Sequence, residues 1–298
     1  MLLAFFFAAA CVTGTDACTE HLPLGPEGRF HLLYRSHPLT ERNESLTNAL
    51  IVIHGASRNA DNYFPSGTAG SFLAGKLDTT LVVAPRFPVP LDKLAPGEIA
   101  FQPRGDDWRG GGPAVDLPTV SAFDVVDKLL AHFANKQLYP NMKKIVVFGH
   151  SAGGQFVNRY VAVSRYDSTL PITFVVSNPS SYLYFDASRP APNAECKGYN
   201  DWKYGLVGKP NSEGFSANAV RRPVVYLLGE YDITPQFSFD ASCSAMTQGP
   251  NRFQRGVNYL EYINGKYKAK HTLVKVPNCG HNGRCMLVAD EARAVLFP

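Results

Sequence analysis

The sequence predicts an α/β fold in which helices cover both faces of a mostly parallel sheet. Two observations support this prediction. Short runs of apolar and β-branched residues alternate along the chain with helix-like segments, which is typical of parallel sheets. One of these runs, 145–148, also leads directly through Gly149-His150-Ser151-Ala152-Gly153 into a helix-like segment. The 298 residues, 45% of them hydrophobic, suffice for a large core, in one domain or in two small ones.

The predicted strands are short apolar runs, several of which end at glycine or proline. We expect strands at residues 30–34, 49–54, 80–84, 145–148, 172–176, 223–228 and 272–276. The predicted helices are longer, and the first of them carries apolar residues on one face. We expect helices at residues 121–133, 152–163, 253–263 and 285–296. No internal repeat is visible, and we interpret residues 18–298 as a single domain.

Two segments interrupt this alternation and are interpreted as insertions, at residues 86–118 and 178–222. The first is rich in proline and glycine, and the second in aromatic residues. Both follow the C-terminal ends of predicted strands, where open α/β sheets bind ligands. Two interpretations stay open: the aromatic side chains pack the long loops onto the domain, or some of them line an apolar substrate pocket. The candidate substrate-binding residues are Trp108, Tyr182 and Trp202.

The N-terminal residues predict export. The apolar run at residues 2–10 is too short to span a bilayer, so no stable membrane insertion is expected. Small residues follow the run, which is typical of a secretory signal peptide, predicted at residues 1–17 with cleavage after Gly14 or Ala17. No Lys or Arg precedes the run. A lipid anchor and a buried first strand are the alternative interpretations.

Cysteine usage agrees with export, because disulfides persist in oxidising compartments. Cys11 would leave with the signal peptide, and Cys18 is expected to stay unpaired. The expected disulfides are Cys279–Cys285, which flanks His281, and Cys196–Cys243, which ties the second insertion to the region after the next strand. Alternatively Cys279, His281 and Cys285 could ligate a metal, but no second cluster of ligands completes such a site. No metal is therefore predicted.

The charge pattern gives no sign of a nucleic-acid partner. The net charge is +4, and apart from one short lysine-rich stretch, residues 266–270, the basic residues are scattered. The sequon Asn43-Glu44-Ser45 is a possible glycosylation site in an exported chain.

The stretch Gly149 to Gly153 fits the G-x-S-x-G pattern of a nucleophile elbow. In this turn the chain passes sharply from strand to helix, and the serine takes a strained conformation that glycines two positions away make room for. The alternative is an ordinary glycine-rich turn. A serine hydroxyl is a poor nucleophile near neutral pH, so Ser151 would need a base and a third group that orients the base.

Later strands supply candidates for both groups. Asp232 lies four residues past the end of the predicted strand 223–228, and His281 lies just past the strand 272–276. Glu230 and Asp240 are alternative acids, of which Asp240 lies further from the strand end. His54 is an alternative base, although a histidine that ends a strand more often has a structural role. His150 lies inside the elbow and is expected to point away from the nucleophile.

An oxyanion hole should complete the site, because acyl transfer places negative charge on the carbonyl oxygen. One expected donor is the N–H of Ala152, which follows the nucleophile. The other should come from the loop that opens with His54-Gly55, where Ala56 is the first candidate and Ser57 the second. Arg58, Asn59 and Asp61 are expected to brace this loop or cap a helix.

Four motifs, IVIHGASRNADNYF, GHSAGG, LLGEYD and CGHNGRC, together resemble the α/β-hydrolase superfamily from about residue 49 to the C-terminus. The order Ser151, Asp232, His281 is the order of that fold. The resemblance implies an eight-stranded sheet, here with the aromatic-rich insertion between the sixth and seventh strands, and a Ser-His-Asp triad. The loop reads HGAS, which departs from the HGGG of many lipases and esterases.

The expected activity is that of a secreted serine hydrolase, which cleaves a carboxylic ester through an acyl-enzyme and needs no cofactor. The substrate would be a small-molecule or polymeric ester. Two other functions remain open: an acyltransferase or peptidase with the same triad, and a non-catalytic binding protein on the same fold. The oligomeric state is not indicated by the sequence.

Overall fold

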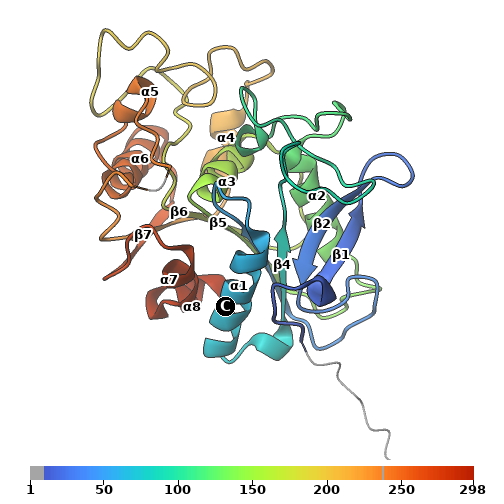
Figure 1. Cartoon of the computed structure of the whole chain (residues 1–298). Coiled ribbons are helices and arrows are strands. Elements are labelled where there is room, and N and C mark those ends of the chain that lie inside the picture. Colours follow the sequence, from blue (N-terminus) through green and yellow to red (C-terminus); the bar gives the residue numbers. More distant parts are fainter. Residues whose placement is uncertain (1–9, 237) are drawn as a thin grey trace, which may run out of the picture.

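One eight-stranded sheet runs through the computed structural model, which describes residues 10–236 and 238–298 (Figure 1). The strand order is β1-β2-β4-β3-β5-β6-β7-β8. The strands are β1 Thr19–Pro23, β2 Phe30–Arg35, β3 Asn48–Ile53, β4 Thr80–Pro85, β5 Lys144–His150, β6 Ile172–Ser177, β7 Val224–Gly229 and β8 Thr272–Val276. The first two strands are antiparallel to their neighbours, and the other pairs are parallel. This confirms the predicted α/β fold class.

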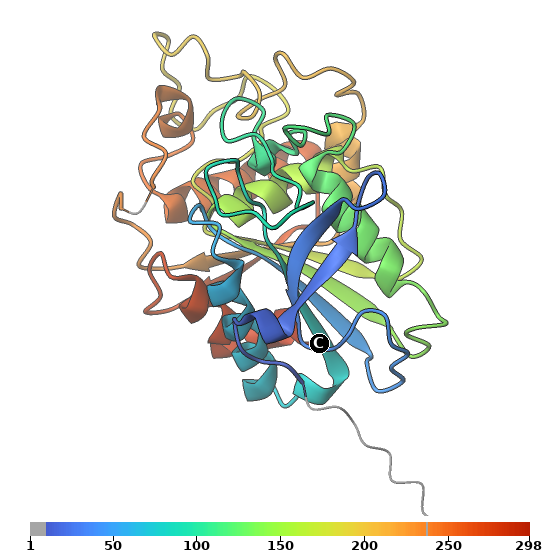
Figure 2. The same ribbon diagram turned by 45° about the vertical axis from the view of Figure 1, so that its right-hand side comes forward.

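Helices cover both faces of the sheet (Figures 1 and 2). The helices are α1 Ala60–Leu73, α2 Ala122–Phe133, α3 Ala152–Val163, α4 Phe215–Arg221, α5 Cys243–Met246, α6 Arg252–Tyr267, α7 Gly283–Val288 and α8 Asp290–Leu296. Side chains of α2, α3, α4 and α6 join one apolar cluster, and those of α1, α7 and α8 join another. The two clusters lie on opposite faces of the sheet because alternate residues of β3, such as Ile51 and Val52, belong to different clusters.

Helix α1 is not predicted by the sequence, because it has no apolar stripe. It contains Pro65, Gly67 and Gly70 among polar residues. Gly67 lies so close to the sheet that an added Cβ would sit 3.1 Å from side-chain atoms of Val52 and Val82. The helix therefore packs through small residues rather than through large apolar ones. The predicted helix at 285–296 is also divided, because Ala289 is extended between α7 and α8.

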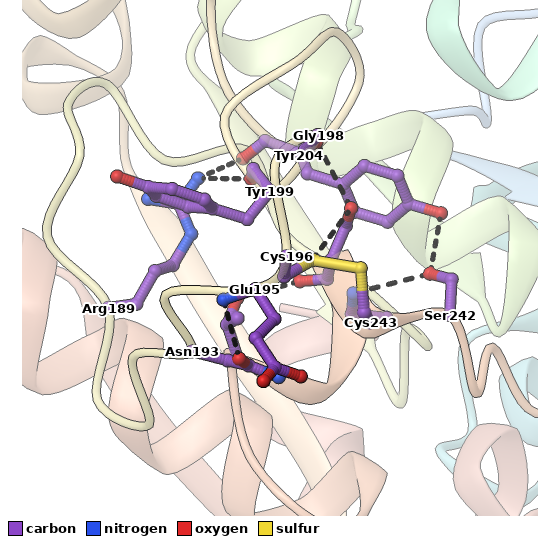
Figure 3. The surroundings of a disulfide bond; sticks show 12 residues. Arg189, Asn193, Glu195, Cys196, Gly198, Tyr199, Tyr204, Ser242 and Cys243 are labelled. Carbon is purple, nitrogen blue, oxygen red and sulfur yellow. Dashed lines mark hydrogen bonds between the residues drawn. A yellow bond between two sulfur atoms is a disulfide. The ribbon is translucent and has the colours of Figure 1, made fainter.

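The second insertion lies between β6 and β7, as predicted, and is fastened to its surroundings at several points. The disulfide Cys196–Cys243, with Cα atoms 5.7 Å apart, ties it to α5 (Figure 3). Within the insertion, the Arg189 guanidinium lies over the ring of Tyr199 and donates to the carbonyl oxygens of Tyr199 and Tyr204. The insertion is thus held by a cation–π contact and hydrogen bonds within it and by a covalent link to α5.

The first insertion, which contains the 3-10 helix η3 Trp108–Gly110, contacts the second one. Lys203 of the second insertion pairs with the buried carboxylate of Asp107. Beside this pair, Trp202 Nε1 donates to Asp106 Oδ1 at 2.9 Å. The two loops therefore form one polar junction at this end of the sheet.

The N-terminal region differs from the prediction. Of the predicted signal peptide at 1–17, residues 1–9 lie outside the described residues. Cys11 and Cys18 form a disulfide, with Cα atoms 5.6 Å apart, so the prediction that Cys18 is unpaired was wrong. The 3-10 helix η1 Asp16–Cys18 turns the chain back toward Cys11, whose N–H donates to Ser36 O at 2.8 Å. Cleavage after Gly14 or Ala17 would cut the loop that this disulfide closes.

No helix in residues 10–236 and 238–298 is long and apolar enough to cross a membrane. The same residues contain no cluster of histidine, cysteine and acidic side chains that could hold a metal ion. Cys279 and Cys285 form a disulfide and offer no thiolate to a metal, which contradicts the alternative interpretation of these cysteines.

Candidate active site

Ser151 lies at the sharp turn between β5 and α3. Its backbone has φ 59° and ψ −114°, a region that costs a residue with a side chain about 1 kcal/mol or more. The glycines around it allow close packing of the turn. A Cβ on Gly149 would lie 2.1 Å from Gly153 O, and a Cβ on Gly153 would lie 2.3 Å from Ile53 O. The glycine positions of the motif are therefore required by the geometry of the turn.

Two later loops bring His281 and Asp232 to this serine. The Oγ of Ser151 lies 2.9 Å from Nε2 of His281. The Nδ1 of His281 lies 2.7 Å from Oδ2 of Asp232, whose side chain is buried. A carboxylate oxygen accepts, so Nδ1 donates to Asp232 and Nε2 is free to accept from the serine hydroxyl. The three predicted residues thus form one continuous hydrogen-bond chain.

Two of the alternative groups, Asp240 and His54, have other partners. Asp240 accepts hydrogen bonds from Tyr204 and Ser242. His54 is buried, and its Nε2 accepts from the N–H of Phe87 at 2.9 Å. Its Nδ1 therefore carries the proton and donates to Gly55 O, and burial lowers the pKa of His54 to about 4. His54 joins two loops as a neutral structural group.

His150 packs behind His281, with the two ring centroids 4.8 Å apart. It is buried, and its Nδ1 lies 2.7 Å from the hydroxyl oxygen of Tyr63. Burial lowers the pKa of His150 well below its ordinary value, with the charge of His281 as a smaller cause. A neutral ring beside His281 avoids the repulsion that a second imidazolium would cause.

The loops that carry Asp232 and His281 are joined to each other. The N–H of Tyr231 donates to Cys279 O at 2.9 Å, and the disulfide Cys279–Cys285 closes the loop around His281. Asn178, which follows β6, accepts from the N–H of Gly229 at 3.0 Å through Oδ1. Its Nδ2 donates to Gly280 O at 3.4 Å. The buried amide of Asn178 thus contacts both loops. The sequence did not single out this residue.

Arg252 is a second residue that the sequence analysis missed. Its side chain is fully buried, with Nη1 3.5 Å from Oδ1 of Asp232 and Nε 2.8 Å from Oγ of Ser180. The carboxylate of Asp232 therefore faces a positive charge on one side and His281 on the other. Arg252 is the first residue of α6, twenty residues from Asp232, and no local motif marks it.

One expected oxyanion donor borders the cleft at Ser151, and the other follows Ser151 in the chain. Ala56 lines it beside Ser151, and Ala152 is the first residue of α3, whose N–H has no partner within the helix. Among the described residues, no acceptor contacts the N–H of Ala56 or Ala152. Arg58 donates to Ala56 O at 3.1 Å and forms a two-pronged ion pair with Asp92 at 2.7 and 2.8 Å. As expected for Arg58, this pair braces the loop.

The candidate substrate-binding residues do not line this cleft. Trp108 is 4% exposed and stacks on Phe87, with ring centroids 5.3 Å apart. Tyr182 is fully buried and stacks on Tyr259 at 4.7 Å. Trp202 is half-buried in the junction between the insertions. The aromatic side chains therefore pack the long loops onto the domain, and the pocket interpretation fails for Trp108 and Tyr182.

Two open clefts meet at His281. We call the first the Ser151 cleft; it measures about 140 Å³ and is lined by residues that include Ala56, Tyr63, Ser151 and His281. We call the second the Tyr231 cleft; it measures about 360 Å³ and is lined by Tyr231, Asp232, Thr234, Gln236, Gly280, His281 and Asn282. His281 belongs to both linings, so the two clefts share this residue.

Comparison with solved structures identifies similar chains. A poly(aspartic acid) hydrolase-1 from Sphingomonas sp. KT-1 is 23% identical, with a TM-score of 0.67 over 94% of this chain and 98% of that one. A poly(3-hydroxybutyrate) depolymerase from Bordetella parapertussis is 22% identical, with a TM-score of 0.64 over 89% and 83%. No family model and no curated protein sequence matches the chain. The structural likenesses concern the fold.

Proposed function

We propose that this chain, which has the α/β-hydrolase fold, is a secreted serine hydrolase that cleaves a carboxylic ester through an acyl-enzyme intermediate. The observation that carries the proposal is the hydrogen-bond chain from Ser151 through His281 to Asp232. Two N–H groups without an acceptor among the described residues, those of Ala56 and Ala152, support it because an acyl-transfer site needs such donors.

In the first half of the proposed reaction, Oγ of Ser151 attacks the carbonyl carbon of the ester. The hydroxyl proton passes to Nε2 of His281, and Asp232 stabilises the imidazolium that forms. The electron pair of the carbonyl bond moves to its oxygen. The N–H groups of Ala56 and Ala152 donate to this oxyanion, which is worth about 3 kcal/mol per donor in comparable sites.

The tetrahedral intermediate then collapses. The bond between the carbonyl carbon and the alcohol oxygen breaks, and His281 gives its proton to that oxygen as the alcohol leaves. A water molecule attacks the acyl-enzyme while His281 takes one of its protons. The acid is released, and Oγ of Ser151 recovers its proton. Water is the only co-reactant, and no cofactor enters the scheme.

The other functions predicted from the sequence need either the same triad or no triad. An acyltransferase or a peptidase would have the same triad and differ in acceptor or in the bond that is cleaved. A binding protein on this fold has no need for an intact triad, whereas here Ser151 and Asp232 both lie within hydrogen-bond distance of His281. We therefore favour hydrolysis. One of the two similar structures named above belongs to a protein named for a polyester, poly(3-hydroxybutyrate), which supports testing a polymeric ester.

Secretion is part of the proposal. Three disulfides, Cys11–Cys18, Cys196–Cys243 and Cys279–Cys285, leave no free cysteine among the described residues. Such pairing is typical of chains that fold in an oxidising compartment. Glycosylation at Asn43 is proposed with it, since Asn43 lies in a sequon and its Nδ2 donates to none of the described residues.

The proposal is tested by hydrolysis of p-nitrophenyl esters from acetate to palmitate. We expect wild-type turnover on at least one ester and a loss of about 10³-fold or more in Ser151→Ala. Ser188→Ala, at an exposed serine of the second insertion, is the matched control and should retain wild-type turnover. Equal turnover in wild type and Ser151→Ala would disprove the assignment of the nucleophile. Complete inactivity of the wild type would disprove general ester hydrolysis.

A further inference from the structure

We propose that the Tyr231 cleft is the binding site for the alcohol part of the ester, and that Tyr231 is the side chain that selects an extended, uncharged, apolar alcohol. The inference rests on the proposed function and deepens it, because it says which half of the substrate the protein recognises. Tyr231, Thr234 and Gln236 form what we call the alcohol subsite.

The position of the subsite follows from the route of the proton. His281 must deliver the proton on Nε2 to the departing alcohol oxygen, so this oxygen has to lie within hydrogen-bond distance of Nε2. The oxyanion must instead face the N–H groups of Ala56 and Ala152. The alcohol therefore leaves past His281. His281 lines the Tyr231 cleft as well as the Ser151 cleft, so the next atoms of the alcohol enter the Tyr231 cleft.

The sizes of the two clefts favour recognition on this side. The Ser151 cleft measures about 140 Å³, and the buried aromatic residues Trp108 and Tyr182 do not open a pocket beside it. The Tyr231 cleft measures about 360 Å³. A ligand segment longer than a few atoms therefore finds more room on the alcohol side of the reacting bond than on the acyl side.

The lining of the Tyr231 cleft suits an uncharged alcohol. Its one acidic side chain, Asp232, is paired with His281 and Arg252, and no Lys or Arg lines it. Thr234 and Gln236 can each donate and accept hydrogen bonds without adding charge. A charged alcohol would find no counter-charge there, whereas an apolar chain that carries ester oxygens would find both apolar and hydrogen-bonding surface.

Tyr231 has the properties of a ligand contact rather than of a packing residue. Its side chain is 60% exposed, which is unusual for a large aromatic residue beside a buried triad. Among the described residues its hydroxyl has no hydrogen-bond partner and its ring stacks on no other ring. Its backbone, by contrast, is fixed by the hydrogen bond to Cys279 O. An exposed ring on a backbone that is fixed in this way is available to bind substrate.

The test compares butyrate esters of ethanol, hexanol and 4-phenylbutanol, with kcat/KM measured by titration of the released acid. We expect Tyr231→Ala to lower kcat/KM for the two long-alcohol esters about tenfold more than for ethyl butyrate, because several methylene groups lose their contact. Tyr231→Phe keeps the ring and should restore the wild-type ratio. Phe72→Ala, at an exposed aromatic residue of α1, is the matched control for loss of exposed apolar surface.

A second series fixes the direction of binding. Ethyl esters of acetate, butyrate and hexanoate vary only the acyl chain, and their relative kcat/KM values should be the same in Tyr231→Ala as in the wild type. An equal loss on every ester, or a change in acyl preference instead of alcohol preference, would overturn the subsite and leave the hydrolase standing. Turnover of ethyl butyrate by Ser151→Ala would overturn the proposed function, and the subsite with it.

Discussion

Asn178 illustrates how single polar residues outside the motifs fix the geometry of the site. It sits just after β6 with a φ of 46°, a left-handed conformation that asparagine tolerates better than most residues. Its side chain is fully buried, and its amide contacts the ends of the loops that carry Asp232 and His281. Loss of this amide would leave the Gly229 N–H and the Gly280 carbonyl without that partner.

Replacement of Asn178 should therefore impair catalysis more than binding. We expect Asn178→Ala to lower kcat about 10- to 100-fold with little change in KM, because a displacement of about 1 Å at the base can cost 10²-fold. Asn178→Asp keeps the acceptor for the N–H of Gly229 and should recover part of the rate. Asn141→Ala, which removes an exposed hydrogen bond to Glu44 O, is the control. A fall in Tm without a fall in kcat below that Tm would contradict a positioning role.

At the residue scale, the predictable part of the site is the part that lies next to a strand end in the sequence. Ser151, Asp232 and His281 each follow a recognisable strand, and each occurs in a distinctive motif. Asn178 also follows a strand, but one asparagine after an apolar run is not distinctive. Arg252 begins a helix and reaches Asp232 only through the tertiary fold. Contacts of this kind have no local pattern and could not be predicted.

Among the elements, the loop between β8 and α7 has the most direct link to the proposed chemistry. The disulfide Cys279–Cys285 closes a short loop around His281, and Asn282 caps α7 by accepting from the N–H of Cys285 at 3.0 Å. His281 is thus held between a covalent link and a capped helix. The whole loop, and not the histidine side chain alone, therefore limits movement of the imidazole away from Ser151.

Removal of this disulfide should affect activity as well as stability. We expect the double variant Cys279→Ser/Cys285→Ser to lose about 2 kcal/mol of unfolding free energy, a typical value for a native disulfide. Its kcat should fall several-fold at temperatures well below its Tm. The matched control is Cys196→Ser/Cys243→Ser, which opens the link in the insertion and should lower Tm with wild-type kcat. Equal kcat in both double variants would contradict a role for the loop.

Helices and strands were predictable where their burial leaves a run or a stripe of apolar residues in the sequence. All six residues of β3 are buried, and the five that follow Asn48 are apolar. Helix α1 is the opposite case, because its contact with the sheet uses Gly67 and other small residues that leave no apolar stripe. The break between α7 and α8 depends on the extended backbone at Ala289, a residue that favours helix in isolation. In both cases tertiary packing overrides the local signal.

Among the described residues, five histidines are buried with a lowered pKa, and the shift is largest for His31, His54 and His150. Burial lowers the pKa of His31 to about 3 and that of His54 to about 4, and it lowers the pKa of His150 well below the ordinary value of 6.5. In the unfolded chain these side chains bind protons as the pH falls below 6.5, whereas in the folded chain they do not. The free energy of unfolding should therefore fall between pH 6.5 and about pH 4, by roughly 1.4 kcal/mol per pH unit for each histidine.

His31 offers the cleanest test of this pH dependence. Neither of its ring nitrogens has a hydrogen-bond partner among the described residues, and it packs beside Phe87 and Phe101. We expect His31→Leu to change the unfolding free energy by less than about 1 kcal/mol at pH 7.5 and to raise it by about 2 to 3 kcal/mol at pH 4.5. Urea denaturation at both pH values measures this difference.

His21→Leu, at an exposed position, is the control for the His31 experiment and should shift the unfolding free energy equally at the two pH values. A His31→Leu variant that gains no more stability at pH 4.5 than at pH 7.5 would show that His31 is not neutral in the folded chain.

At this largest scale the sequence predicted the α/β class and the place of the second insertion, because both depend on the order of the elements. It did not predict the disulfide between Cys11 and Cys18, because the apolar run before Cys11 suggested that this cysteine would be removed. It also did not predict that Trp108 and Tyr182 would be interior. Whether a long loop exposes or buries its aromatic residues depends on contacts between the loops, such as that of Lys203 with Asp107.

The position of His281 after the last strand of the sheet has a consequence during synthesis of the protein. During synthesis Ser151 emerges from the ribosome more than a hundred residues before the histidine that would activate it. The strand β8, which aims that histidine, can join the sheet only beside β7. A growing chain therefore carries Ser151 without His281 until more than a hundred further residues have been made. Under the proposed function, ester hydrolysis begins only after β8 has joined the sheet, because Ser151 has no base before then.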